Sequence, residues 1–330
     1  MDTRLNTARI RAAREVIDPV FLNTPLYDCE ALTPELGCSV SIKLETANPV
    51  RSFKGRGTEL VADQLTGTAA VCASAGNLGQ ALAWSGRKRG LDITVVASRF
   101  ATPAKLDRIR ALGATLELVD GDHELARDRA AAIARRTGIR LVEDSLDLET
   151  CEGAATIGLE LVDPSFDTVL IALGGGAMAT GIGHVLKDLS PQTEVVCVQP
   201  AGAPAMTLSW RQGRVVTTDS AITIADGVAG RRPIPEVLVD LLQVVDDAVL
   251  VEESSIVTGV RLLHTHAGLV AEPSAALGLA ALLENPARFA GRRVATIICG
   301  SNVNPPDHHR WTSTPDRSPT HRAPETPPRQ

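Results

Sequence analysis

Short apolar runs that alternate with longer helical segments are the feature that most constrains how this chain can fold. Strand-like runs rich in Val, Ile and Ala recur at residues 70–73, 93–97, 115–119, 169–173, 195–199, 244–249 and 294–299. Helical patterns recur at residues 78–89, 103–112, 123–137, 150–161, 178–189, 252–264 and 274–283. This order is typical of parallel strands joined by helices that cover both faces of a sheet. We therefore expect an α/β fold with twisted, mostly parallel sheets flanked by helices.

The length of the chain favours two sheets. At 330 residues it can build two separate cores. We expect residues 68–144 to form a small domain, and residues 1–67 together with 145–304 to form a large domain that carries most of the binding site. From residue 305 the composition turns to Pro, Arg, Ser and Thr. Such a segment buries too little apolar surface to fold, so we expect residues 305–330 to form a disordered tail.

Composition excludes several classes of partner. The net charge is −6 and the pI is about 5.7, which indicates neither nucleic acid nor a membrane surface. No apolar stretch approaches the roughly 20 residues that span a bilayer, and residues 1–17 lack a signal core. The six cysteines form no C-x-x-C pair, and several lie in strand-like runs. We expect buried, reduced thiols in a cytoplasmic protein.

Four loops follow predicted strands, where open α/β sheets bind their ligands. The first, Ser52-Phe53-Lys54, joins a strand-like run at 39–45 to a helical pattern. A lysine can form a Schiff base with a carbonyl compound when part of its population is neutral. Burial and a helix N-terminus both disfavour its cation. Taken alone, Lys54 is typical of a solvated lysine in a first helical turn.

Two further loops carry weaker signals. Ser74-Ala75-Gly76-Asn77 stands between a strand and a helix, where free N–H groups can bind a small anion such as a carboxylate. Taken alone, the loop is also explained by N-capping. Cys299 follows the last predicted strand, and its thiol can bond a ring nitrogen without protonating it. Taken alone, it is a core cysteine before a turn.

The fourth loop, Gly174–Gly181, gives the strongest single signal. Consecutive glycines let the backbone wrap a phosphate with its N–H groups pointing inward. The spacing of Gly174, Gly176 and Ala179 also matches a degenerate dinucleotide fingerprint, which requires an acidic residue after the next strand. Gln199 occupies that place. A bare phosphate therefore fits the loop better than a dinucleotide does.

Together, the lysine, the anion-binding loop, the phosphate loop and a weak ring-nitrogen partner are the parts of a pyridoxal phosphate site. In these motifs the chain resembles the fold-type II pyridoxal phosphate enzymes, which share a tryptophan synthase β-like fold. Within them it resembles the threonine/serine dehydratase group, which includes serine racemase. The resemblance spans residues 23–304. It rests on Ser52-Phe53-Lys54, Ser74–Asn77, the glycine loop, Thr223–Gly227, Glu272-Pro273 and Cys299–Asn302.

The resemblance implies pyridoxal 5′-phosphate as cofactor, a small amino-acid substrate and a homodimer. Lys54 would be the catalytic residue, holding the cofactor as an internal aldimine and shuttling the Cα proton. The cofactor-binding residues would be Phe53, Lys54, Asn77, Gly174, Gly175, Gly176, Ala177, Met178 and Cys299. The substrate-binding residues would be Ser74, Ala75, Gly76 and Asn77. Gly227 and Glu272 would line the site.

The chain also departs from the pattern at specific positions. Ala75 replaces the second catalytic serine of serine racemase, which argues against racemase activity. Gln199 and Ala205 replace the acidic ligands of that enzyme's divalent metal, so we expect no such site. Val50 and Arg51 replace a Thr and a small residue before Ser52, which leaves the substrate open.

The resemblance implies β-elimination of L-threonine, L-serine or a similar β-hydroxy amino acid to a 2-oxo acid and ammonia. Three alternatives stay open. The first is a β-replacing lyase or a threonine-synthase-like enzyme. The second is an ammonia-lyase for another β-substituted amino acid, such as 3-hydroxyaspartate or a diaminopropionate. The third is a non-catalytic cofactor or metabolite binder, against which the intact Lys54 and Ser74 argue.

Overall fold

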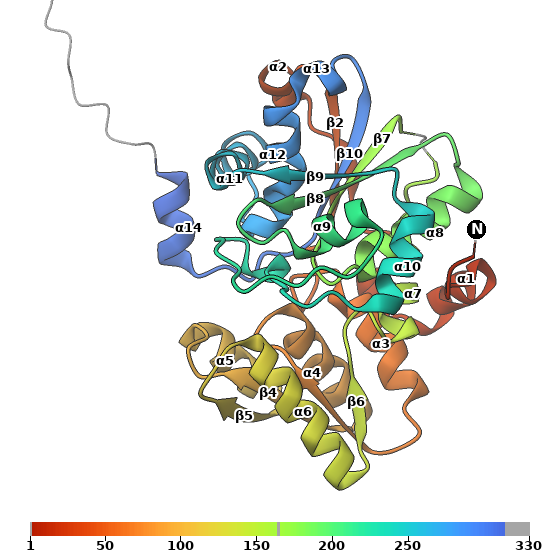
Figure 1. Ribbon diagram of the computed structural model, residues 1–330, viewed down its shortest axis with the longest axis vertical. Coiled ribbons are helices and arrows are strands. Elements are labelled where there is room, and N and C mark those ends of the chain that lie inside the picture. The colour runs from red at the N-terminus through yellow and green to blue at the C-terminus, as the bar shows by residue number, and fades with distance from the viewer. Residues whose placement is uncertain (1, 164–165, 314–330) are drawn as a thin grey trace, which may run out of the picture.

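The computed structural model describes residues 2–163 and 166–313, which form two sheets with helices packed on them (Figure 1). The six-stranded sheet has the order β1-β2-β10-β7-β8-β9, and the four-stranded sheet has the order β5-β4-β3-β6. The strands are β1 (Leu26–Asp28), β2 (Ser39–Leu44), β3 (Ala69–Ala73), β4 (Asp92–Ser98), β5 (Thr115–Val119), β6 (Arg140–Val142), β7 (Thr168–Ala172), β8 (Glu194–Pro200), β9 (Asp247–Val251) and β10 (Arg293–Ile298).

Helices occupy most of the chain between the strands. The α-helices are α1 (Thr7–Val16), α2 (Thr33–Leu36), α3 (Lys54–Gln64), α4 (Asn77–Arg89), α5 (Pro103–Ala111), α6 (His123–Thr137), α7 (Leu148–Leu159), α8 (Ala177–Leu189), α9 (Ala205–Gln212), α10 (Pro235–Val244), α11 (Glu253–Ala267), α12 (Leu277–Glu284), α13 (Pro286–Phe289) and α14 (Pro305–Thr312). The 3₁₀ turns are η1 (Pro19–Phe21), η2 (Glu30–Leu32), η3 (Asp226–Val228) and η4 (Pro273–Ala276).

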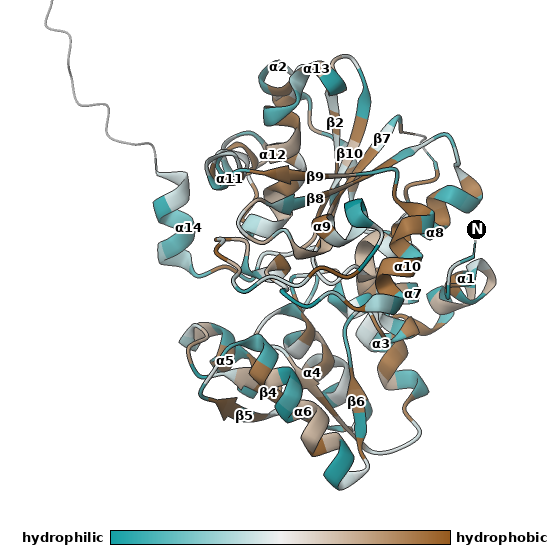
Figure 2. Ribbon diagram, viewed as in Figure 1, coloured by the Kyte–Doolittle hydropathy of each residue, from teal (hydrophilic) through white to brown (hydrophobic). Residues whose placement is uncertain are grey.

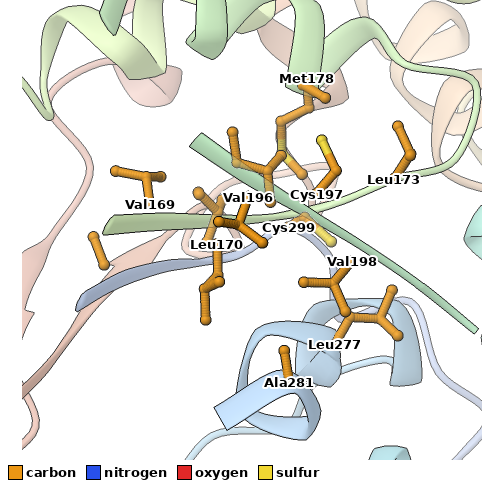
Figure 3. Close-up of a cluster of buried hydrophobic side chains, with 14 of the residues drawn as sticks. Val169, Leu170, Leu173, Met178, Val196, Cys197, Val198, Leu277, Ala281 and Cys299 are labelled. Carbon is orange, nitrogen blue, oxygen red and sulfur yellow. The ribbon is translucent and has the colours of Figure 1, made fainter. Parts of the chain in front are cut away.

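Both sheets confirm the expected α/β fold. Every strand pair is parallel except β1 with β2, which is antiparallel. The strands of the larger sheet are mostly apolar, whereas α14 is mostly hydrophilic (Figure 2). Figure 3 shows why the sheet needs cover on both faces. Side chains of β7 and β8 pack toward Met178 of α8 on one side and toward Leu277 and Ala281 of α12 on the other. Strands buried on both faces explain the continuous apolar runs.

Some element boundaries differ from the expectation. The strand predicted at 244–249 begins at Asp247, because α10 extends to Val244. A disordered tail was predicted from residue 305, but Pro305–Thr312 forms α14. Two prolines at its start suit a helix N-terminus, where their missing N–H groups are not needed. The rest of that prediction, residues 314–330, lies outside the described residues.

The two sheets draw on separate parts of the chain. Residues 69–142 supply the four-stranded sheet, and residues 26–44 and 168–298 supply the six-stranded one. Ion pairs join the two parts, including Lys105 with Asp226 and Arg231 with Asp122. Because these pairs lie far apart in the sequence, they hold the carboxyl ends of the two sheets facing each other.

A buried ionic network fixes the helix that begins at Lys54. Arg56, in the first turn of α3, is fully buried. It donates to Glu45 after β2 at 2.8 Å and to Glu160 after α7 at 2.7 Å. Lys43 also binds Glu160, at 2.5 Å. Burial alone would lower the pKa of Arg56, but Glu45 and Glu160 raise it above its ordinary value. The guanidinium therefore stays charged and joins α3, β2 and α7.

All six cysteines are buried and unpaired, as the sequence predicts. Within the ranges that the structure describes, no helix is both long and apolar enough to cross a bilayer.

We predict that Glu160→Gln lowers the free energy of unfolding by about 3–5 kcal/mol, because it leaves Arg56 and Lys43 buried without their shared partner. Burial would raise the pKa of Glu160, but Arg56 and Lys43 lower it by more. The stabilisation is therefore present above the unfolded pKa of about 4.3 and is lost as the pH falls through the lower folded pKa.

Urea unfolding at pH 7 and at acidic pH measures this effect. Glu15→Gln, at an exposed glutamate of α1, is the control and should stay within about 0.5 kcal/mol of the original protein. A Glu160→Gln protein as stable as the control at pH 7 would contradict the interpretation.

Candidate active site

A cavity of about 500 Å³ lies between the carboxyl ends of the two sheets. The loops that follow β3, β7 and β10 line it, together with the turn before α3. All the candidate cofactor- and substrate-binding residues line this one cavity: Phe53, Lys54, Ser74, Ala75, Gly76, Asn77, Gly174, Gly175, Gly176, Ala177, Met178 and Cys299. Gly227 and Glu272 also line it. The structure therefore brings together motifs that are as far as 245 positions apart in the sequence (54 to 299).

Three helices start at the cavity. The first residues of α3, α4 and α8 are Lys54, Asn77 and Ala177, and all three line its wall. The N-terminus of a helix carries unpaired N–H groups and the positive end of the helix dipole. The cavity is consequently suited to a ligand with more than one anionic group.

Backbone pairing places Lys54 beside Cys299. Ser52 and Gly300 form an antiparallel bridge, and the N–H of Phe53 donates to the carbonyl of Cys299 at 3.1 Å. The amide of Asn48 shapes the preceding turn by donating to the carbonyl of Ser52 at 3.1 Å. The loop after β10 and the start of α3 thus form one rigid corner of the cavity.

The Lys54 amine points into the cavity and has a charged partner. Its Nζ lies 2.6 Å from Asp144 Oδ2 and 4.5 Å from the ring centroid of Phe53. The lysine side chain is only 15% exposed. It is therefore not the solvated surface lysine that its sequence position alone would allow.

The glycine loop can be built only from glycine. A Cβ at Gly175 would lie 2.7 Å from Ser145 Oγ, and one at Gly176 would lie 2.5 Å from a methyl group of Val237. Gly176 also has φ = +110°, which disfavours other residues. Among the described residues, the N–H groups of Gly174 and Gly175 have no hydrogen-bond acceptor. These free donors fit a phosphate group.

Ser145 supports the glycine loop and was missed by the sequence reasoning. Its fully buried hydroxyl accepts a hydrogen bond from the N–H of Ala177 at 3.0 Å. This N–H, expected to point at the phosphate, is therefore already engaged. The hydroxyl of Ser145 has one proton left to donate, and it lines the same cavity. Ser145 thus adds a side-chain donor where a backbone donor is used up.

The Ser74–Asn77 loop keeps some donors free and holds one side chain rigidly. Ser74 Oγ accepts from the N–H of Gly76 at 3.1 Å, while the N–H groups of Ala75 and Asn77 have no acceptor among the described residues. The Asn77 amide donates to Glu272 at 2.8 Å and accepts from Asn302 at 2.7 Å. One N–H of the Asn77 amide remains for a ligand.

Cys299 and Glu272 form the buried floor of the cavity. Burial raises the pKa of the Cys299 thiol far above its usual value, so the thiol is neutral at physiological pH. Burial also raises the pKa of Glu272, although Ser274 and Asn77 donate to its carboxylate. A neutral thiol can bond a pyridine nitrogen but gives it no proton.

Asp144 is a second residue that the sequence reasoning missed. It follows β6, a strand of only three residues that the pattern did not reveal. Had this strand been recognised, the rule that ligands bind at carboxyl ends would have pointed to Asp144 and Ser145. Conversely, Val50 is buried in a separate apolar cluster and Arg51 is exposed, and neither lines the cavity.

Comparison with known proteins agrees with this geometry. The family model described as "Pyridoxal-phosphate dependent enzyme" matches residues 17–300. The L-threonine ammonia-lyase of Thermotoga maritima is 31% identical over 301 residues, which cover 89% of this chain and 75% of that protein. The beta-hydroxyaspartate dehydratase of Paracoccus denitrificans is 29% identical over 300 residues, covering 89% and 95%.

Among solved structures, a threonine deaminase from the organism abbreviated T.th. superposes with a TM-score of 0.86 at 30% identity. The match covers 91% of this chain and 99% of that one. The two-sheet architecture and its connections are therefore shared over nearly the whole described chain.

We predict that Ser145→Ala weakens pyridoxal phosphate binding about tenfold, because it removes a support of the glycine loop and a side-chain donor, together worth about 1–1.5 kcal/mol. Titration of cofactor-free protein with pyridoxal phosphate, followed by absorbance, measures the dissociation constant. Ser190→Ala removes an equally buried serine outside the cavity and should leave that constant unchanged. Equal affinities for the two variants would exclude Ser145 from the binding site.

Proposed function

The chain belongs to the family of pyridoxal-phosphate dependent enzymes, and on that premise we propose that it is an ammonia-lyase. The substrate would be L-threonine, L-serine or a similar β-hydroxy amino acid, and the products a 2-oxo acid and ammonia. The convergence of Lys54, the glycine loop and the neutral Cys299 on one cavity carries this proposal. Relatives named for threonine ammonia-lyase and dehydratase activity support the same reaction class.

When bound, pyridoxal phosphate supplies a ring that withdraws electrons from the α-carbon of an amino acid. The residues of this chain would do the rest. Gly174, Gly175 and Ser145 hold the phosphate, and Lys54 Nζ anchors the aldehyde carbon. Once the substrate amine has displaced it, Lys54 Nζ takes the proton from the α-carbon.

The Ser74 loop would orient the substrate. The free N–H groups of Ala75 and Asn77, together with the Ser74 hydroxyl, would bind its carboxylate at the start of α4. The Asn77 amide, held by Glu272 and Asn302, would donate its remaining N–H to the ring oxygen of the cofactor. This grip sets which bond of the α-carbon faces Lys54.

Cys299 would set the course of the reaction. Its neutral thiol bonds the ring nitrogen without donating a full proton, so the ring is a modest electron sink. A modest sink stabilises negative charge at the α-carbon only briefly. This favours prompt loss of the β-hydroxyl over other uses of the same charge.

A second candidate substrate class is a β-hydroxy amino acid with an acidic side chain. Arg127 and Arg232 line the cavity, and their contacts with Glu124 are long, at 3.4 and 3.8 Å. Loosely held guanidinium groups are available for a carboxylate. The relative named beta-hydroxyaspartate dehydratase supports testing this class.

We predict that the purified protein, loaded with pyridoxal phosphate, releases a 2-oxo acid and ammonia in equal amounts from at least one β-hydroxy amino acid. The panel should include L-threonine, L-serine, 3-hydroxyaspartate and 2,3-diaminopropionate. Lys54→Ala should lose at least about a thousandfold in kcat, because it removes both anchor and base.

Two results would contradict the proposal. A protein that turns over only when a second nucleophile or a phosphorylated substrate is added would be a replacing enzyme. A protein that binds the cofactor yet converts nothing in the panel would not be an ammonia-lyase for these substrates.

A further inference from the structure

We propose that Asp144 is a catalytic residue that holds the positive charge Lys54 acquires when it takes the α-proton of the substrate. This inference rests on the function proposed above, and it assigns a role to a residue outside the recognised motifs. The starting observation is the contact between the two side chains, 2.6 Å from Nζ to Oδ2.

The two oxygens of Asp144 differ in their surroundings. Oδ2 accepts from Lys54, whereas Oδ1 is inaccessible to water and has no hydrogen-bond partner among the described residues. Neighbouring bonds hold the residue in place. The N–H of Glu143 donates to Asp147 at 3.1 Å, and the N–H of Ser145 donates to Thr150 at 3.0 Å. Asp144 therefore stands on a loop that is fixed on both sides.

The register of the small sheet places Asp144 beside the substrate loop. Strands β3 and β6 are parallel, and Cys72 pairs with Val142. Two residues farther along each strand are Ser74 and Asp144, which leave the same edge of the sheet side by side. An amino acid held by the Ser74 loop would accordingly present its α-carbon close to both Lys54 Nζ and Asp144.

The other acidic groups of the cavity have different partners. Glu272 accepts from Asn77 and Ser274, and Asp226 pairs with Lys105. Asp144 is the carboxylate that the described residues place against Lys54. The pairing is thus specific and does not reflect a general excess of acid.

The proton transfer explains what the pair does. The Cα–H bond of the substrate breaks, an N–H bond forms on Lys54 Nζ, and the electron pair stays on the α-carbon. Nζ changes from a neutral amine to an ammonium, so positive charge develops within contact of the Asp144 carboxylate. A fixed charge placed where the opposite charge develops lowers the barrier of the step, most strongly where water is excluded.

The first experiment measures the pair without substrate or cofactor. Full-length cofactor-free protein is labelled with a limiting amount of acetic anhydride at pH 8, and each lysine is quantified by peptide mass spectrometry. Only the neutral amine reacts. Asp144→Asn should raise the labelling rate of Lys54 several-fold relative to the other lysines. Glu143→Gln, one residue away and in contact with Arg127, should not change it.

The second experiment follows the proton itself. Exchange of the substrate α-proton for deuterium in D₂O, read by NMR, reports the step whether or not the β-hydroxyl leaves. In the loaded enzyme, Asp144→Asn should slow exchange and kcat about tenfold or more, leave KM within about threefold, and increase the isotope effect of α-deuterated substrate. Asp144→Glu should recover part of the rate.

The outcomes separate this inference from the proposed function. Unchanged Lys54 labelling, or unchanged α-proton exchange in Asp144→Asn, would overturn the role of Asp144. A loss of thermal stability that leaves the exchange rate of the folded enzyme unaltered would also overturn it, since the pair would then be merely structural. An original protein that exchanges the α-proton but releases no 2-oxo acid would sink the ammonia-lyase function while leaving Asp144 in its role.

Discussion

The pairing of residues 51–53 with residues 299–301 is the interaction on which the geometry of the site depends. Two backbone hydrogen bonds, from Phe53 to Cys299 and from Ser301 to Arg51, join the start of α3 to the end of β10. Behind this corner, Arg56 ties α3 to Glu45 and Glu160 in a fully buried network. The chain spends buried charge, which is costly to desolvate, to fix one helix start. Lys54 and Cys299 therefore keep a constant separation while ligands enter and leave.

Electrostatics divides the cavity into regions with different tasks. The helix starts at Asn77 and Ala177 offer free N–H groups to anions. Cys299 is kept neutral by burial, so it cannot protonate a ring nitrogen. Opposite these, Asp144 pairs with Lys54. The arrangement suits a reaction in which a proton moves between an α-carbon and a lysine while two anionic groups of the bound molecules stay fixed.

Much of this arrangement could be predicted from the sequence, for identifiable reasons. The α/β fold followed from apolar strands buried on both faces, and the glycine loop followed from a run that only a tight approach of backbone requires. Lys54 was ambiguous alone and became convincing only beside the other loops. Asp144 and Ser145 escaped because β6 is three residues long and too short to show a pattern. The engagement of the Ala177 N–H by Ser145 also escaped, because no local pattern encodes a contact across 32 residues.

The central claim is that Lys54 anchors the cofactor, and borohydride reduction of the loaded protein tests it most directly. Reduction makes the link between a lysine and pyridoxal phosphate permanent, and peptide mass spectrometry then identifies the lysine. The account predicts one phosphopyridoxyl group, on the peptide that contains Lys54, and none in the Lys54→Ala protein. A label on Lys105, the other lysine that lines the cavity, or no label at all, would contradict it.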